Sequence, residues 1–131
     1  MALYECMVGN NSGGESGFDE TVLWTNSSPT AQGNISLSGN ISDYDFLKIT
    51  WAYDNSSGSR RESMYIPTDG MDSSSYWALC STTGNQGYQS RIRSMGYVND
   101  TTLFKSTGYI IGGGSGDSIC IPVEIAGANF K

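Results

Sequence analysis

The sequence predicts an all-β fold, an antiparallel β-sandwich of jelly-roll-like kind, and three observations lead to it. Apolar and polar residues alternate in short runs, which is typical of strands with one buried face. Clusters of Gly, Ser, Asn and Asp separate these runs every 8–12 residues or so, as in sandwiches and small barrels. No helical periodicity persists beyond a turn or two, and 131 residues fit one domain.

The clearest run is "LKITWAY" at residues 47–53. Its residues on one face are Leu47, Ile49, Trp51 and Tyr53. This apolar face indicates a half-buried strand, and it places Trp51 in the core.

Weaker runs come before and after this strand. In "TVLWT" either Leu23 or Trp24 faces inward, and in "GNISLSG" Ile35 and Leu37 do. Further candidate strands are "ESMYI", with Met64 and Ile66 on one side, and "YWALCST", "YQSRIRSMGY", "TTLFKS" and "GYII". In the last strand, "SICIPVEI", Pro122 has no N–H for the ladder, so this strand lies at a sheet edge or has a bulge at the proline.

The chain divides into an N-terminal strand with a possible hinge (1–17) and a sandwich domain (18–131). The hinge is "NSGGESG", for which an ordinary surface loop is the alternative. The first residues, "MALYECMVGNNSGG", lack the basic start and long apolar core of a secretory signal, so we expect folding in a cytoplasm. The three cysteines have no paired spacing, which favours free thiols over one disulfide with a spare thiol.

Composition excludes several classes of function. A net charge of −6 repels the phosphate backbone, so we expect no nucleic-acid binding. No run is apolar for the roughly 18 residues that would span a bilayer, so we expect no membrane insertion. The chain has no histidine, which removes Ser–His–Asp and Cys–His catalysis and histidine metal sites. Acids in the loops around Asp69, Asp72 and Asp117 do not follow a calcium-loop pattern. We therefore expect no enzyme, no catalytic residue, no metal and no cofactor.

Aromatic side chains among many hydroxyls and amides are the main indication of binding. Flat rings stack on the C–H faces of sugars and are also frequent in protein interfaces. Two arginines on one strand could bind an anionic ligand or a neighbouring subunit's acids, although a salt-bridged exposed strand face is the default reading for them. The candidate ligand-binding residues are Trp24, Trp77, Tyr76, Tyr88, Arg91 and Arg93.

Two segments together resemble a known group of proteins. "LWTNSSPTA" followed by "GNISLSGNISDYDFLKITWAYD", and the closing "CIPVEIAG", are similar to modules in tail-fibre, receptor-binding and head-fibre proteins of tailed bacteriophages. The resemblance covers about residues 20–54 and 117–127. It implies a β-sandwich or jelly-roll-like module of a virion, made in the bacterial host cytoplasm and commonly trimeric. No set of catalytic or binding residues comes with it.

The leading hypothesis is a non-enzymatic virion structural or adhesin module, either a tail fibre, a receptor-binding protein or a head-fibre or decoration protein. Its partners would be further copies of itself, with a trimer favoured, other virion proteins, and a glycan or protein receptor on the bacterial surface. The alternative is a carbohydrate-binding module of a bacterial enzyme or surface protein. A glycan hydrolase that uses two carboxylates is a third, weaker reading.

Overall fold

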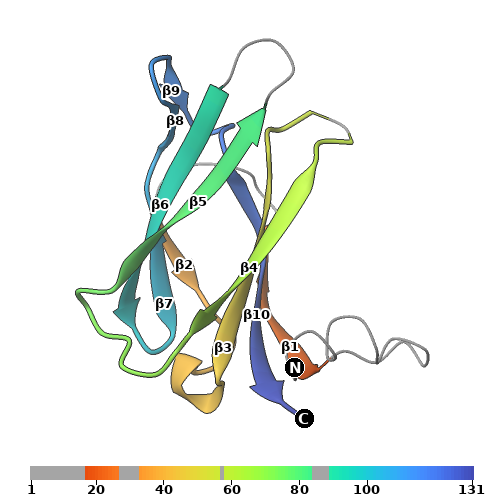
Figure 1. Cartoon of the computed structure of the whole chain (residues 1–131). Coiled ribbons are helices and arrows are strands. Elements are labelled where there is room, and N and C mark those ends of the chain that lie inside the picture. Colours follow the sequence, from red (N-terminus) through yellow and green to blue (C-terminus); the bar gives the residue numbers. More distant parts are fainter. Residues whose placement is uncertain (1–16, 27–32, 57, 84–88) are drawn as a thin grey trace.

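Ten strands form two antiparallel sheets in the computed structural model, which describes residues 17–26, 33–56, 58–83 and 89–131. The sheets face each other as the two layers of a sandwich (Figure 1). Sheet A contains, in spatial order, β1 (Phe18–Thr25), β10 (Ile121–Phe130), β3 (Phe46–Ala52) and β4 (Arg61–Pro67). Sheet B contains β2 (Gly33–Ser36), β7 (Thr102–Lys105), β6 (Gln89–Asn99), β8 (Gly108–Ile110) and β9 (Ser115–Gly116), with β5 (Tyr76–Thr83) beside β6. The predicted antiparallel sandwich is confirmed.

The chain wraps so that early strands pair with late ones. β1 and β3 both pair with β10, and β2 pairs with β7 in the opposite sheet. β7 and β8 follow each other along one edge of β6, and β5 occupies its other edge. β1 and β2 thus pair with strands from later in the chain, whereas β3–β4 and β5–β6 pair as neighbours in the sequence. The helical element of the described residues is one 3-10 turn, η1 (Ile41–Asp43), and none of their helices has the length and apolarity to span a membrane.

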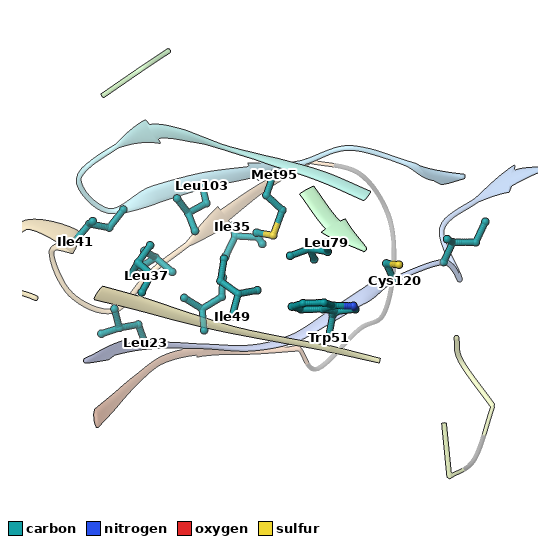
Figure 2. Packing of buried hydrophobic residues seen from close by; sticks show 13 residues of the cluster. Leu23, Ile35, Leu37, Ile41, Ile49, Trp51, Leu79, Met95, Leu103 and Cys120 are labelled. Atoms are coloured by element: carbon teal, nitrogen blue, oxygen red, sulfur yellow. The ribbon is translucent and has the colours of Figure 1, made fainter. Parts of the chain in front are cut away.

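The core lies between the sheets and follows the predicted alternation. Trp51 is 4% exposed, and Leu47 and Ile49 beside it on β3 are fully buried, which confirms the reading of this strand. Ile35 and Leu37 are buried against them, as expected. Figure 2 shows Trp51 at the end of the core near Leu79 and Cys120, with Leu23 and Ile41 towards the opposite end.

Pro122 lies in β10, a central strand, so of the two alternatives for this proline the edge position is wrong and the bulge is right. The pairing of β10 with β3 shifts register between Pro122 and Glu124, which accommodates the missing N–H. Just before the strand, Cys120 has a positive φ of 47°. Ile119, Cys120, Ile121 and Pro122 are all buried, so the simple alternation of buried and exposed residues does not hold in the residues that precede the bulge.

Cys80 and Cys120 are free thiols, one exposed and one buried, as the cysteine spacing predicted. Cys6 lies outside the described residues, as does the predicted N-terminal strand.

A glycine fixes the packing of β10, because a Cβ on Gly127 would lie 2.4 Å from the ring of Tyr44. Only a residue without a side chain lets that ring pack against the backbone of this strand.

Candidate functional site

The outer face of sheet B carries no charged side chain in any of its described strands. Side chains alternate along a strand, and the inward residues Ile35, Leu79 and Leu103 are buried, so their neighbours face outward. These outward residues are Asn34, Ser36, Tyr76, Ala78, Cys80, Thr82, Ser90, Ile92, Ser94, Gly96, Thr102, Phe104, Tyr109 and Ser115. We call them the neutral face. For a chain with a net charge of −6, a whole face without charge is notable, and the outer face of sheet A in contrast carries Glu20, Lys48, Arg61 and Glu124.

Two exposed rings occupy one row of the neutral face. Tyr76 is 80% exposed and pairs across β5 and β6 with Gly96, which in turn pairs with Phe104, itself 40% exposed. Neighbouring strands are separated by about 4.8 Å, so the two aromatic residues stand roughly 10 Å apart. Gly96 between them has no side chain, and the row continues with the amide of Asn34. The row therefore offers two flat apolar faces beside a hydrogen-bonding group.

A second apolar group lies towards the β8 end of the neutral face. Tyr109, which is 46% exposed, pairs directly with Ile92, and Ile92 pairs with the exposed Cys80. Ser94 lies on β6 between this group and the first row. Hydroxyls thus alternate with rings and aliphatic groups over the face, a mixture suited to contact with an uncharged polar partner.

The cations of sheet B point inward instead. Arg93 is fully buried between the sheets, where its guanidinium cross-links several backbone carbonyls. Its Nε donates to Ser106 O at 2.6 Å, and its Nη1 donates to the carbonyls of Asp117 (3.1 Å) and Ile119 (3.3 Å). Nη2 lies 3.6 Å from Oδ1 of Asp117, whose side chain is 42% exposed. This arginine joins β6 to the segment that leads into β10.

Burial lowers the pKa of the Arg93 guanidinium, and the charge of Asp117 partly opposes that shift. Lys105, on the same inward face and 8% exposed, also has a lowered pKa, because of burial first and the nearby charge of Arg93 second. The two cations are therefore held in the interior by their surroundings and are not presented to a ligand.

Arg91 takes part in a cation–π stack at one end of the sandwich. Its guanidinium lies 4.2 Å from the centroid of the Tyr53 ring, and that of Arg60 lies 5.0 Å from the same centroid. Nη2 of Arg60 also donates to Thr82 O at 2.8 Å and lies 3.9 Å from Glu62. These contacts tie the β3–β4 hairpin to sheet B.

A buried hydrogen-bond chain lies beneath that stack. Nε1 of Trp51 donates to Oγ of Ser81 at 2.9 Å, and the Ser81 hydroxyl donates to Oε2 of Glu62. The pKa of the nearby Cys120 thiol is raised because burial disfavours the thiolate, and the Ser81 hydroxyl partly opposes that shift. A thiol held in its neutral form is a poor nucleophile, and the contacts at this end of the molecule connect the two sheets.

Four aromatic rings pack together on the outer face of sheet A. Phe18 stacks on Tyr65 with centroids 4.8 Å apart, and Phe46 meets Phe130 edge-to-face at 5.2 Å. Two small residues of β10, Ala126 and Ala128, share this outer face and are 1% and 0% exposed. The rings thus form a small external core over the alanines, and only Phe130 keeps most of its surface, at 64%.

The pKa of Tyr65 is raised from its ordinary value of 10.0 to about 12, by burial first and then by the hydrogen bond from its hydroxyl to Oε2 of Glu20 (2.8 Å). The folded state thus favours the neutral phenol, so its contribution to stability is complete below about pH 10 and is lost as the pH rises towards 12.

In an ultraviolet titration, one phenolate of the wild type should appear near pH 12 and be missing from Tyr65→Phe. Glu20→Gln should move that step down towards pH 10; an unmoved step would contradict the assignment to this pair.

The structure separates the candidate ligand-binding residues that the sequence suggested. Tyr76 lies on the neutral face, whereas Trp24 and Trp77 are half-buried and pack against the core. Arg91 and Arg93 also point inward, so the exposed strand face that the sequence allowed for them is wrong. The last candidate, Tyr88, lies outside the described residues.

Sequence reasoning missed Phe104, and it noted Tyr109 among the aromatic residues without choosing it as a ligand-binding candidate. Each follows or precedes an aliphatic residue in a run of three or four residues, so alternation alone left open which neighbour faces solvent.

In the described part of the chain, no three His, Cys, Asp or Glu side chains gather closely enough to hold a metal ion. Comparison of the sequence with protein-family models and with curated proteins finds no match.

Proposed function

We propose that this chain is a non-enzymatic binding module and that the neutral face is its contact surface. The observation that carries the proposal is the distribution of charge in sheet B, where cations are buried and the exposed face holds rings, hydroxyls and an amide. Aromatic side chains are enriched and charged side chains are depleted at the centre of protein interfaces, and the neutral face has the same composition. The resemblance to phage fibre modules supports a place in a virion, where such a face would contact a glycan or protein of the bacterial surface.

A carbohydrate-binding module of a bacterial enzyme or surface protein is the second candidate. The row of Tyr76, Gly96 and Phe104 favours it, because two rings separated by a residue without a side chain leave room for a sugar unit between two stacking positions. Both candidates use the same face, and an uncharged saccharide is a partner for both, whereas a protein receptor belongs to the first candidate alone. They differ in the origin of the protein and not in the chemistry of the surface.

Binding to an array of bacterial surface glycans tests the proposal. The double variant Tyr76→Ala/Phe104→Ala should lose affinity for a bound glycan by roughly tenfold or more, since two stacking contacts of about 0.5–1.5 kcal/mol each are removed. The matched control is Phe130→Ala, which removes a ring of similar exposure from the outer face of sheet A. Equal binding by wild type and double variant, or loss confined to the control, would refute the neutral face as the contact surface.

A further inference from the structure

The edges of the two sheets differ in how well they are protected from pairing with another chain. An unpaired edge strand recruits other strands unless it is short, bulged, charged or interrupted by proline. In sheet A, β1 carries Asp19 and Glu20 and has a bulge, and β4 carries Arg61, Glu62 and Pro67. In sheet B, β2 has four residues and β9 has two. β5 has eight residues with no charge, no proline and no register shift.

β5 also has free backbone groups along its outer edge. Tyr97 N–H donates to Ser75 O. In an antiparallel ladder every second residue forms hydrogen bonds with the neighbouring strand, so the backbone groups of Trp77, Leu79 and Ser81 are those that bond to β6. The backbone groups of the residues between them point away from β6. Among these, Thr82 O accepts from Arg60 at 2.8 Å, while Tyr76, Ala78 and Cys80 have no partner at this edge in the described chain.

An incompletely covered apolar seam runs beside this edge. On the opposite side of the sandwich, Ser38 N–H donates to Leu23 O and so joins the two sheets. On this side, β4 and β5 lie next to each other (Figure 1) without pairing. Four apolar residues of these two strands and the segment between them are only partly buried against the core: Met64, Ile66, Met71 and Trp77. Nε1 of Trp77, which belongs to this seam, is an indole N–H that is buried without a hydrogen-bond partner among the described residues.

We propose that a second copy of this chain pairs antiparallel with β5, so that two copies of sheet B form one continuous sheet. An antiparallel strand is complementary to itself through a twofold axis, and the absence of charge lets two chains of net charge −6 approach along this strip. One register pairs the free backbone groups of Tyr76, Ala78 and Cys80 and keeps the hydrogen bond from Arg60 to Thr82 O. In this register Ala78 lies opposite Ala78 of the other copy, and Tyr76 lies opposite Cys80. The pair covers both seams and joins both neutral faces, and it differs from the trimer that the phage resemblance implies.

Analytical ultracentrifugation of the full chain, from micromolar to near-millimolar concentration, tests the pairing. The wild type should reach the mass of two chains. Ala78→Lys should raise the dimer dissociation constant by roughly tenfold or more, because two ammonium groups then face each other across the axis. The matched control Ser63→Lys puts the same charge on an outward position of the β4 edge and should leave the dimer unchanged. A single-chain mass at all concentrations, a trimer, or equal effects of both substitutions would overturn the proposal.

Disulfide trapping fixes the register without relying on a charged variant that fails to fold. In a Cys80→Ser background, Ala78→Cys should form a covalent dimer on mild oxidation, because hydrogen-bonded antiparallel partners have Cα atoms about 5.5 Å apart, within the range for a disulfide. Ser63→Cys in the same background is the control and should stay unlinked, and Cys6 is common to both. Equal cross-linking of the two variants would overturn the β5 pairing. These readouts measure mass alone, so they do not depend on glycan binding, and a failure of one proposal leaves the other standing.

Discussion

Replacing Trp51 by alanine is expected to lower the free energy of unfolding by about 3–5 kcal/mol. The side chain is 4% exposed and lies at the end of the core between the two sheets (Figure 2). Its removal leaves a cavity beside Leu79 and Cys120, and it also takes the indole N–H donor away from Ser81. Urea denaturation followed by circular dichroism measures the change.

Trp51→Phe separates the two contributions to this loss. Phenylalanine keeps much of the ring volume but cannot donate to Ser81, so its cost should be clearly smaller than that of alanine. A loss below about 1 kcal/mol for the alanine variant would show that Trp51 does not fill the core. It would then become a candidate for stacking on a ligand.

Replacing Arg93 by methionine is expected to cost a similar amount, about 3–5 kcal/mol. Methionine fills most of the aliphatic volume but leaves the carbonyls of Ser106, Asp117 and Ile119 without their donor in the interior. Each such group costs about 1–3 kcal/mol when it is buried and unpaired. The partial exposure of Asp117 means that its lost ion pair adds little to this sum.

Arg61→Met is the matched control for Arg93→Met. Arg61 lies exposed on the outer face of sheet A, so the same substitution there should change stability by less than about 0.5 kcal/mol. Thermal and urea unfolding of the two variants give the comparison. Equal losses for the two substitutions would mean that Arg93 does not cross-link the interior.

The sequence predicted best the elements whose alternation is unambiguous. In "LKITWAY" every second residue is apolar, so both the strand and its buried face followed. In "YQSRIRSMGY" the parity was clear but the buried face was not, because Arg91 and Arg93 share a face with Met95 and Tyr97. Met95 was the only local indication that this face is the buried one. The pairing of Arg93 with Leu79 in β5 decides which face is buried, and that is a long-range contact that the local pattern does not report.

Other features could not be predicted because they depend on which strands pair. Pro122 fits a central strand only through the register shift between β10 and β3, and no local pattern reports that β10 has neighbours on both sides. Likewise Tyr76 was recognised as a candidate from its aromatic ring, but Phe104 becomes its companion only because β5 and β7 flank β6. Local alternation therefore predicted the class of fold, whereas the proposed contact surface could be recognised only from the topology.

The uncharged character of the neutral face also bears on the kinetics of capture. A surface without charge gives no long-range attraction to guide a partner, so encounters should form at about 10⁵–10⁶ M⁻¹s⁻¹, the range for unsteered association. For the same reason the encounter rate should depend little on ionic strength. A module of this kind would hold its target through a slow release and through several copies acting together, and it would work equally well in dilute and in salty media.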